Sequence, residues 1–207
     1  MVRLKVCGIT SYDDARAAIE CGAEYLGFNF YPPSPRFIAP NAAREIITRL
    51  PETIMGVGIF VNETEPEFVI RTMRECGLRF AQLHGDEDTD YCARVGAERV
   101  IKALRVSDDF DRRAALDFPA SAILLDAYDR KLYGGTGRTT DWEVARELAN
   151  QAKVFLAGGL SPDNIAEAVR TVRPYAVDVN SGVESAPGRK DAEKLRRLAQ
   201  ILNSLFH

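Results

Sequence analysis

The sequence has few residues that could bind a metal or form disulfides. Only four cysteines and two histidines occur among 207 residues, and the cysteines lie far apart without a C-x-x-C pair. Structural zinc sites and disulfide frameworks both need such residues in characteristic groups. The sequence therefore argues against both, and Cys21, Cys76 and Cys92 are interpreted as small structural residues of helices.

Long apolar runs and a strong charge bias are also missing. No segment approaches the run of about 18 apolar residues that a membrane span needs, and the N-terminus lacks the apolar stretch and cleavage site of a signal peptide. The net charge is −3, which gives no general attraction to nucleic acid or to membranes. We expect a cytoplasmic protein that binds neither, in which a local site holds any anionic ligand.

Strand-like apolar runs alternate with helical patterns along the whole chain. The predicted strands are Leu4–Val6, Tyr25–Phe28, Met55–Phe60, Phe80–Leu83, Val100–Leu104, Ala122–Leu125, Val154–Leu156 and Ala176–Val179. The predicted helices are Tyr12–Cys21, Asn41–Leu50, Pro66–Cys76, Asp88–Val95, Trp142–Ala149, Asp163–Val172 and Asp191–Leu205, with a weaker pattern over Asp108–Leu116. Such alternation predicts an α/β fold with a parallel sheet, and eight units can close it into a (β/α)8 TIM barrel.

No linker, low-complexity tract or charge run divides the chain, so we expect a single catalytic domain over residues 1–207. A chain of this length can bury a sizeable core. The alternative fold is an open, doubly wound sheet, but its G-x-G-x-x-G turn does not follow the first strand. In a barrel, functional residues lie at the carboxyl ends of the strands and in the loops after them.

Glycine-containing turns follow the last two predicted strands: Gly158-Gly159-Leu160-Ser161, then Asn180-Ser181-Gly182-Val183. Glycine lets backbone N–H groups approach an anion, and a helix N-terminus just beyond adds partial positive charge. Two such turns match the phosphate site after strands 7 and 8 of a barrel. The predicted phosphate-binding residues are Gly158, Gly159, Leu160, Ser181 and Gly182. The alternative is a tight turn before a helix capped by Ser161.

Two residues at strand ends could provide a base and an acid. Side-chain alternation along the first strand places Lys5 and Cys7 toward the barrel axis, and a thiol near cations can act as a base or nucleophile. Asp126 directly follows an apolar strand, where a carboxylate is costly unless it is protonated or hydrogen-bonded, and such a group suits general acid catalysis. The two could face each other across the mouth of the barrel. The alternatives are an inert buried thiol and a loop-capping aspartate.

Arg36 is the candidate for binding a carboxylate. Prolines stiffen the loop that carries it, and a guanidinium held in this way suits bidentate binding. The alternative is an exposed arginine without such a role. His84 follows the fourth strand and is interpreted as a turn residue in preference to a catalytic one.

The alternation makes one further structural prediction. The last strand neighbours the first in a closed barrel, and Asp178 has the inward parity, so we expect it to contact Lys5.

The segment Tyr128–Thr139 contains Gly134-Gly135-Thr136-Gly137. It resembles a nucleotide-binding loop, but no P-loop lysine follows it. This long, glycine-containing segment is therefore interpreted as a lid.

Taken in order along the chain, these motifs resemble the phosphoribosylanthranilate isomerases of tryptophan biosynthesis. The residues that carry the resemblance are Lys5-Val6-Cys7-Gly8-Ile9-Thr10, Ser34-Pro35-Arg36, Gln82-Leu83-His84-Gly85, Leu124-Leu125-Asp126, Gly134-Gly135-Thr136-Gly137, Ala157-Gly158-Gly159-Leu160 and Val179-Asn180-Ser181-Gly182-Val183-Glu184. The resemblance covers essentially the whole chain. One position departs from the expected pattern, because Asn180 stands where a serine is more usual.

The resemblance implies an Amadori rearrangement of N-(5-phosphoribosyl)anthranilate to 1-(2-carboxyphenylamino)-1-deoxyribulose 5-phosphate, without metal or other cofactor. It further implies that Cys7 is the general base, that Asp126 is the general acid and that Arg36 binds the anthranilate carboxylate. The competing hypotheses are another phosphosugar isomerase or epimerase on the same barrel and a non-catalytic protein that binds phosphorylated ligands. Whether the chain is a monomer or a homodimer stays open.

Overall fold

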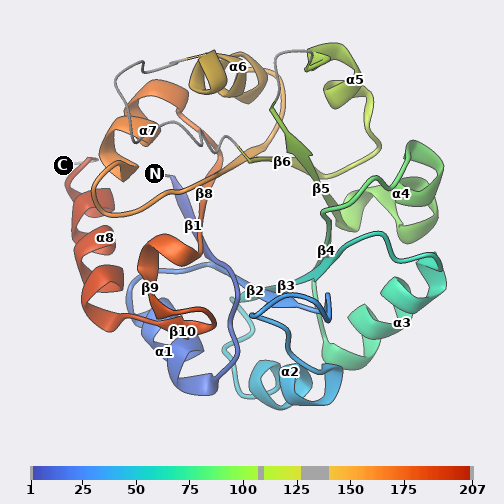
Figure 1. The fold of residues 1–207 in the computed structure, drawn as a ribbon, viewed down its shortest axis with the longest axis horizontal. Coiled ribbons are helices and arrows are strands. Elements are labelled where there is room, and N and C mark those ends of the chain that lie inside the picture. Colours follow the sequence, from blue (N-terminus) through green and yellow to red (C-terminus); the bar gives the residue numbers. More distant parts are fainter. Residues whose placement is uncertain (1, 107–109, 127–139, 206–207) are drawn as a thin grey trace.

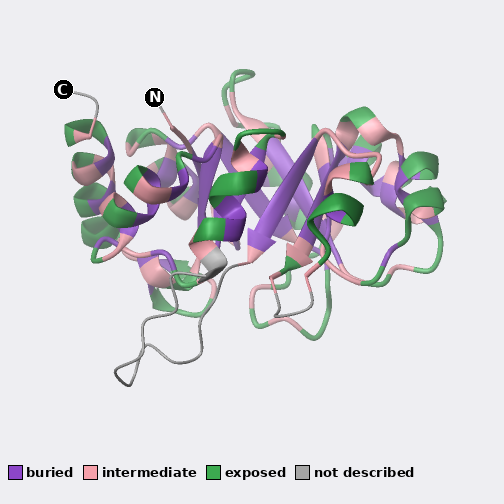
Figure 2. Ribbon diagram, turned by 90° about the horizontal axis from the view of Figure 1, so that it is seen from above, coloured by how far each residue is buried: buried purple, intermediate pink, exposed green. Residues whose placement is uncertain are grey.

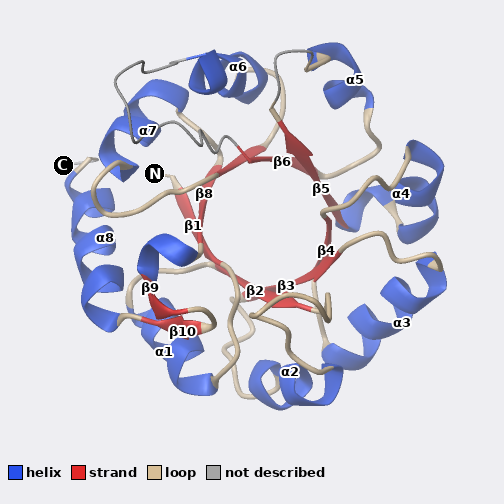
Figure 3. Cartoon of the chain, in the orientation of Figure 1, coloured by secondary structure: helices blue, strands red, loops and turns tan. Residues whose placement is uncertain are grey.

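The computed structural model describes residues 2–106, 110–126 and 140–205. Eight parallel strands form a closed barrel in which each strand pairs with the next and β8 pairs with β1 (Figure 3). The strands are β1 (Arg3–Val6), β2 (Tyr25–Asn29), β3 (Met55–Phe60), β4 (Phe80–Leu83), β5 (Val100–Arg105), β6 (Ala122–Asp126), β7 (Val154–Ala157) and β8 (Ala176–Val179). The predicted barrel is confirmed, and the bounds of every predicted strand agree within one residue.

Eight α-helices surround the barrel in the described part of the chain (Figure 1). They are α1 (Tyr12–Glu20), α2 (Pro40–Ile47), α3 (Pro66–Cys76), α4 (Thr89–Val95), α5 (Arg112–Asp117), α6 (Thr140–Ala149), α7 (Ile165–Val172) and α8 (Ala192–Ser204). Two short 3-10 helices, η1 (Ala97–Arg99) and η2 (Ser181–Val183), complete the set. None of the described helices has the length and apolar character to cross a membrane.

Local sequence explains where the helices begin. Ser11, Asp88 and Asp191 each accept hydrogen bonds from backbone N–H groups of the first turn, and Pro40 and Pro66 occupy first positions where no N–H is needed.

Three predicted starts were wrong. Helix α6 begins at Thr140, two residues before the predicted Trp142. Helix α7 begins at Ile165 because residues 162–164 form a turn, and α5 begins at Arg112, where Asp111 accepts hydrogen bonds from the N–H groups of Arg113 and Ala114.

The strand alternation separates two buried sets of side chains. The larger set fills the space between the barrel and the helices and includes Leu4 and Val6. The smaller set fills the inside of the barrel, where Tyr25 packs edge-on against Phe155 with ring centroids 5.1 Å apart. Figure 2 shows the strands buried between the exposed outer faces of the helices. The prediction that Leu4 and Val6 face the helices is confirmed.

A two-stranded antiparallel hairpin was not predicted. It consists of β9 (Glu184–Ala186) and β10 (Arg189–Lys190) and lies between η2 and α8 in the chain. In Figure 1 the hairpin lies beside α1, near the end of β1. The hydroxyl of Thr10 donates to the carbonyl of Gly188 at 2.5 Å and ties the hairpin to the loop after β1.

A buried ion pair fastens the loops after β3 and β4. Lys102 Nζ lies 2.7 Å from Glu87 Oε2, and both side chains are 2% exposed. The same carboxylate accepts hydrogen bonds from the N–H groups of Asn62 and Gly85, and Lys102 also donates to the Gly85 carbonyl. Removing one partner of such a pair leaves an uncompensated buried charge.

We therefore predict that Glu87→Gln lowers the free energy of unfolding by about 3 kcal/mol, because the Lys102 ammonium loses its counter-charge. Chemical denaturation would measure this. Glu67→Gln is the matched control, since its pair with Arg94 is more than half exposed on both sides and should cost less than about 1 kcal/mol. Equal losses in the two variants would contradict the prediction.

Candidate active site

A cavity of about 290 Å³ lies at the carboxyl ends of the strands. Its walls come from the ends of β1 to β8, with the exception of β5, and from the loops after β7 and β8. The residues that line it are Cys7, Asn29, Ile59, Gln82, His84, Leu124, Asp126, Ala157, Gly158, Gly159, Leu160, Asp178, Asn180 and Ser181. The cavity therefore contains both proposed acid–base residues and four of the five predicted phosphate-binding residues.

Cys7 and Asp126 enter this cavity from different strands. Cys7 follows the last residue of β1 and is buried, whereas Asp126 ends β6 and is half-buried. The barrel brings together side chains that are 119 positions apart in the sequence, 126 − 7. A small molecule in the cavity can contact both groups.

The ionisation of Cys7 reflects two opposed effects. Burial raises the pKa of the Cys7 thiol, while the ammonium groups of Lys5 and Lys190 act to lower it. Burial is the larger effect, so the net pKa is raised. The thiol is therefore more strongly protonated than the sequence argument from nearby cations predicted.

The predicted contact between Lys5 and Asp178 is confirmed. Their side chains form a buried ion pair at 2.7 Å, and the two residues are register partners in the β1–β8 pairing. Burial acts to lower the pKa of Lys5, but the Asp178 carboxylate and the Cys7 thiol raise it overall, so the ammonium stays charged. The Oδ1 atom of Asp178 is buried and has no hydrogen-bond partner among the described residues. Because Asp178 also lines the cavity, this oxygen can accept a hydrogen bond from a ligand.

The two glycine-containing turns pack against each other. Gly158 and Gly159 have φ angles of 95° and 60°, a region that favours glycine. A Cβ atom at Gly182 would overlap the carbonyl oxygen of Leu160, so only glycine permits this approach. The backbone N–H groups of four residues donate no hydrogen bond to another described residue: Gly159, Leu160, Ser181 and Gly182. These N–H groups are available to an anion such as phosphate.

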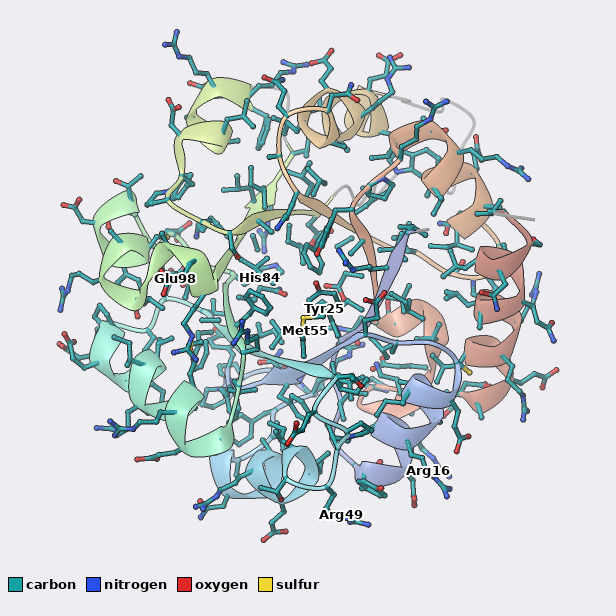
Figure 4. All side chains as sticks on the ribbon, turned by 180° about the vertical axis from the view of Figure 1, so that it is seen from behind. Arg16, Tyr25, Arg49, Met55, His84 and Glu98 are labelled. Atoms are coloured by element: carbon teal, nitrogen blue, oxygen red, sulfur yellow. The ribbon has the colours of Figure 1, made fainter. Side chains whose placement is uncertain are left out.

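Gln82 and His84 form a polar pair on the cavity wall. Gln82 Nε2 lies 2.8 Å from His84 Nδ1, and Gln82 Oε1 is buried without a partner among the described residues. Burial lowers the pKa of His84, which favours the neutral ring. Figure 4 shows His84 directed toward the centre of the barrel. His84 lies in the loop after β4 and has a hydrogen-bond partner, as interpreted, but its side chain also lines the cavity.

Arg36 lies beside the cavity and is held by a carboxylate. Its Nε donates to Glu184 Oε1 at 2.9 Å and its Nη2 donates to Glu184 Oε2 at 2.6 Å. These hydrogen bonds raise the pKa of Arg36. Lys190 also binds the Glu184 carboxylate. Sequence reasoning assigned no role to Glu184 or Lys190, because it did not recognise the hairpin that carries both residues.

The remaining sequence predictions concern metals and a lid. Among residues 2–106, 110–126 and 140–205, no group of three or more histidine, cysteine, aspartate or glutamate side chains is arranged to hold a metal ion. The predicted lid, Tyr128–Thr139, lies outside the described residues.

We predict that Gly182→Ala weakens the binding of inorganic phosphate by about tenfold or more, because the added methyl group pushes the two turns apart and misaligns their N–H groups. Isothermal titration calorimetry would measure the dissociation constant. Gly22→Ala is the matched control: Gly22 also has a positive φ, of 87°, but a Cβ there meets no atom within 4 Å. An unchanged constant in Gly182→Ala would show that these turns do not form the phosphate site.

Comparison with known proteins agrees with this geometry. A family model described as N-(5'-phosphoribosyl)anthranilate (PRA) isomerase matches residues 4–201. The chain is 54% identical over 197 residues to N-(5'-phosphoribosyl)anthranilate isomerase of Trichlorobacter lovleyi, with 95% of each chain covered.

Solved structures give the same result. Phosphoribosyl anthranilate isomerase from Thermotoga maritima has a TM-score of 0.87 at 42% identity, covering 99% of this chain and 100% of that one. A phosphoribosyl anthranilate isomerase in complex with reduced 1-(o-carboxyphenylamino)-1-deoxyribulose 5-phosphate has a TM-score of 0.86 at 40% identity, with the same coverage. The chain therefore belongs to the N-(5'-phosphoribosyl)anthranilate isomerase family.

Proposed function

We propose that Cys7 and Asp126 are the general base and general acid with which this isomerase converts N-(5-phosphoribosyl)anthranilate into 1-(2-carboxyphenylamino)-1-deoxyribulose 5-phosphate. The observation that carries the proposal is that one cavity of about 290 Å³ is lined by this thiol, this carboxyl group and the paired glycine turns. A phosphate bound at the turns would fix the sugar between the two side chains, which is the positioning that acid–base catalysis needs.

The reaction begins at the ring oxygen of the sugar. Protonated Asp126 gives its proton to this oxygen while the nitrogen lone pair forms a double bond to C1, so the furanose opens to a protonated Schiff base. The Cys7 thiolate then removes the proton from C2, and the C2–H electrons form an enolamine. The enolamine gains a proton at C1 and loses one from its C2 hydroxyl, which yields the ketone and leaves the overall composition unchanged.

The surroundings of Cys7 suit a base that is uncharged in the resting site. Burial favours the neutral thiol, whereas Lys5 and Lys190 favour the thiolate. The positively charged Schiff base is a third cation that forms only after ring opening. Its charge stabilises the thiolate at the step that uses it, and the thiol proton passes to the Asp126 carboxylate, which has just given its own proton to the ring oxygen.

The other polar groups around the cavity would bind the ends of the substrate. The N–H groups of Gly159, Leu160, Ser181 and Gly182, together with the small Gly158, would hold the phosphate. Arg36 would hold the anthranilate carboxylate, since a guanidinium matches a carboxylate in two parallel hydrogen bonds. One family relative was solved in complex with reduced 1-(o-carboxyphenylamino)-1-deoxyribulose 5-phosphate, a ligand that has both a carboxylate and a phosphate.

We predict that Cys7→Ala and Asp126→Asn each lower kcat by on the order of 10²-fold or more, because each removes one proton-transfer group. Loss of phosphoribosylanthranilate fluorescence would give the rate. Binding of reduced 1-(o-carboxyphenylamino)-1-deoxyribulose 5-phosphate should change far less. Cys21→Ala is the control, since Cys21 ends α1 outside the barrel. Unaltered turnover in either active-site variant would remove that residue from its role.

We predict that Arg36→Ala raises KM by about tenfold or more, because the loss of a charge-assisted bidentate contact weakens substrate binding. Steady-state kinetics with the same fluorescence assay would measure it. Arg44→Ala on α2, whose residue is exposed, serves as the control. A KM equal to that of the unaltered enzyme would show that another group binds the carboxylate.

A further inference from the structure

Glu184 is the centre of a buried charge cluster at the edge of the active site. Besides its contacts with Arg36, it lies 2.9 Å from Lys190 Nζ and accepts a hydrogen bond from the N–H of Gly188 at 3.2 Å. Lys190 Nζ also donates to Asn180 Oδ1 at 3.1 Å, and Asn180 lines the cavity. We call Arg36, Asn180, Glu184 and Lys190 the Glu184 cluster.

The Glu184 cluster carries an excess positive charge in a nearly dry place. The side chains of Glu184 and Lys190 are 4% and 1% exposed, and that of Arg36 is 19% exposed. Two cations thus share one carboxylate, which leaves a net charge of +1 when all three are ionised. An uncompensated buried charge is costly, and burial lowers the pKa of Lys190 accordingly, so the cluster favours one further anionic group beside it.

Arg36 is also fixed in direction. Glu184 binds its Nε and Nη2 atoms, while Nη1 forms no hydrogen bond with another described residue. The aliphatic part of the side chain crosses Gly8, where an added Cβ would lie 2.8 Å from both Arg36 Cδ and Asn180 Oδ1. Gly8 directly follows Cys7. The side chain of Arg36 is therefore held beside the loop after β1, with Nη1 as the nitrogen that Glu184 does not bind.

We propose that Glu184 and Lys190 are positioning residues that make the site selective for substrates whose aromatic amine carries a carboxylate. Glu184 holds the guanidinium of Arg36 in one orientation, and the excess charge of the cluster is balanced by the carboxylate of the substrate. This inference rests on the proposed role of Arg36. It adds that the selectivity originates in the β9–β10 hairpin, which supplies both residues.

The test compares two stable ligands that differ only in the carboxylate. The first is reduced 1-(o-carboxyphenylamino)-1-deoxyribulose 5-phosphate, and the second is its phenylamino counterpart. Calorimetry gives the ratio of their dissociation constants for each variant. Glu184→Asp should reduce the preference for the carboxylated ligand by about tenfold, because the shorter side chain keeps the charge of the cluster but loses the bidentate contact that orients Arg36. The exposed Glu75→Asp on α3 is the matched control.

A double-mutant cycle shows whether Glu184 acts through Arg36. In an Arg36→Ala background, Glu184→Asp should leave the preference within about twofold of the single Arg36→Ala variant. A further loss as large as in the unaltered enzyme would overturn the proposed coupling. So would a Glu184→Asp variant that keeps the full preference.

If Glu184→Asp does not fold, Lys190→Met provides the second variant. It keeps the pair between Arg36 and Glu184 but neutralises the cluster, so the preference should again fall by about tenfold. An undiminished preference would overturn the charge argument. These measurements use no turnover, so their failure is distinct from failure of the proposed function, which is read from the kinetics of Cys7→Ala, Asp126→Asn and Arg36→Ala.

Discussion

The pairing of β1 with β8 is the constraint on which the site depends. It closes the barrel, and inside it Lys5 and Asp178 meet as register partners at 2.7 Å. Because strand side chains alternate, a slip of one residue would turn Cys7 toward the helices and remove it from the cavity. The buried ion pair opposes such a slip, since either charge would then lie unpaired in an apolar layer. Closure also brings the loop after β8 beside the loop after β1, so the phosphate turns and the thiol share one cavity.

Charge around Cys7 is arranged in opposed pairs. Lys5 is balanced by Asp178, and Lys190 and Arg36 are balanced in part by Glu184. Hydrogen bonds from Arg36 and Lys190 outweigh the effect of burial on Glu184 and lower its pKa. The Glu184 carboxylate thus stays ionised and limits the field of Arg36 and Lys190 on the thiol. A site with the same cations but without these carboxylates would hold Cys7 as a permanent thiolate, which would attract small electrophiles at all times.

The alternation of apolar runs was enough to predict the barrel, the strand bounds and the contact between Lys5 and Asp178. It succeeded because parallel strands buried on both faces leave a strong pattern. The hairpin escaped because β9 and β10 are only three and two residues long and carry charged side chains. The sequence alone therefore pointed to Arg36 but not to Glu184 or Lys190. The position of His84 on the cavity wall also escaped, because a histidine after a strand has no periodic signal and only the closed barrel shows that it faces the cavity.

The hairpin has a consequence for how this enzyme could change its substrate. Residues 181–182 and residues 184–190 lie in one short segment, yet the first contribute to the phosphate turns and the second contact Arg36. The hairpin is attached to the rim and forms no part of the barrel wall. With the roles proposed above, exchange of residues 184–190 alone would alter recognition of the aromatic half of the substrate, while residues 181–182, Cys7 and Asp126 would be retained. The hairpin can therefore vary with the aromatic group of the substrate, whereas the barrel strands and the glycine-containing turns must stay the same.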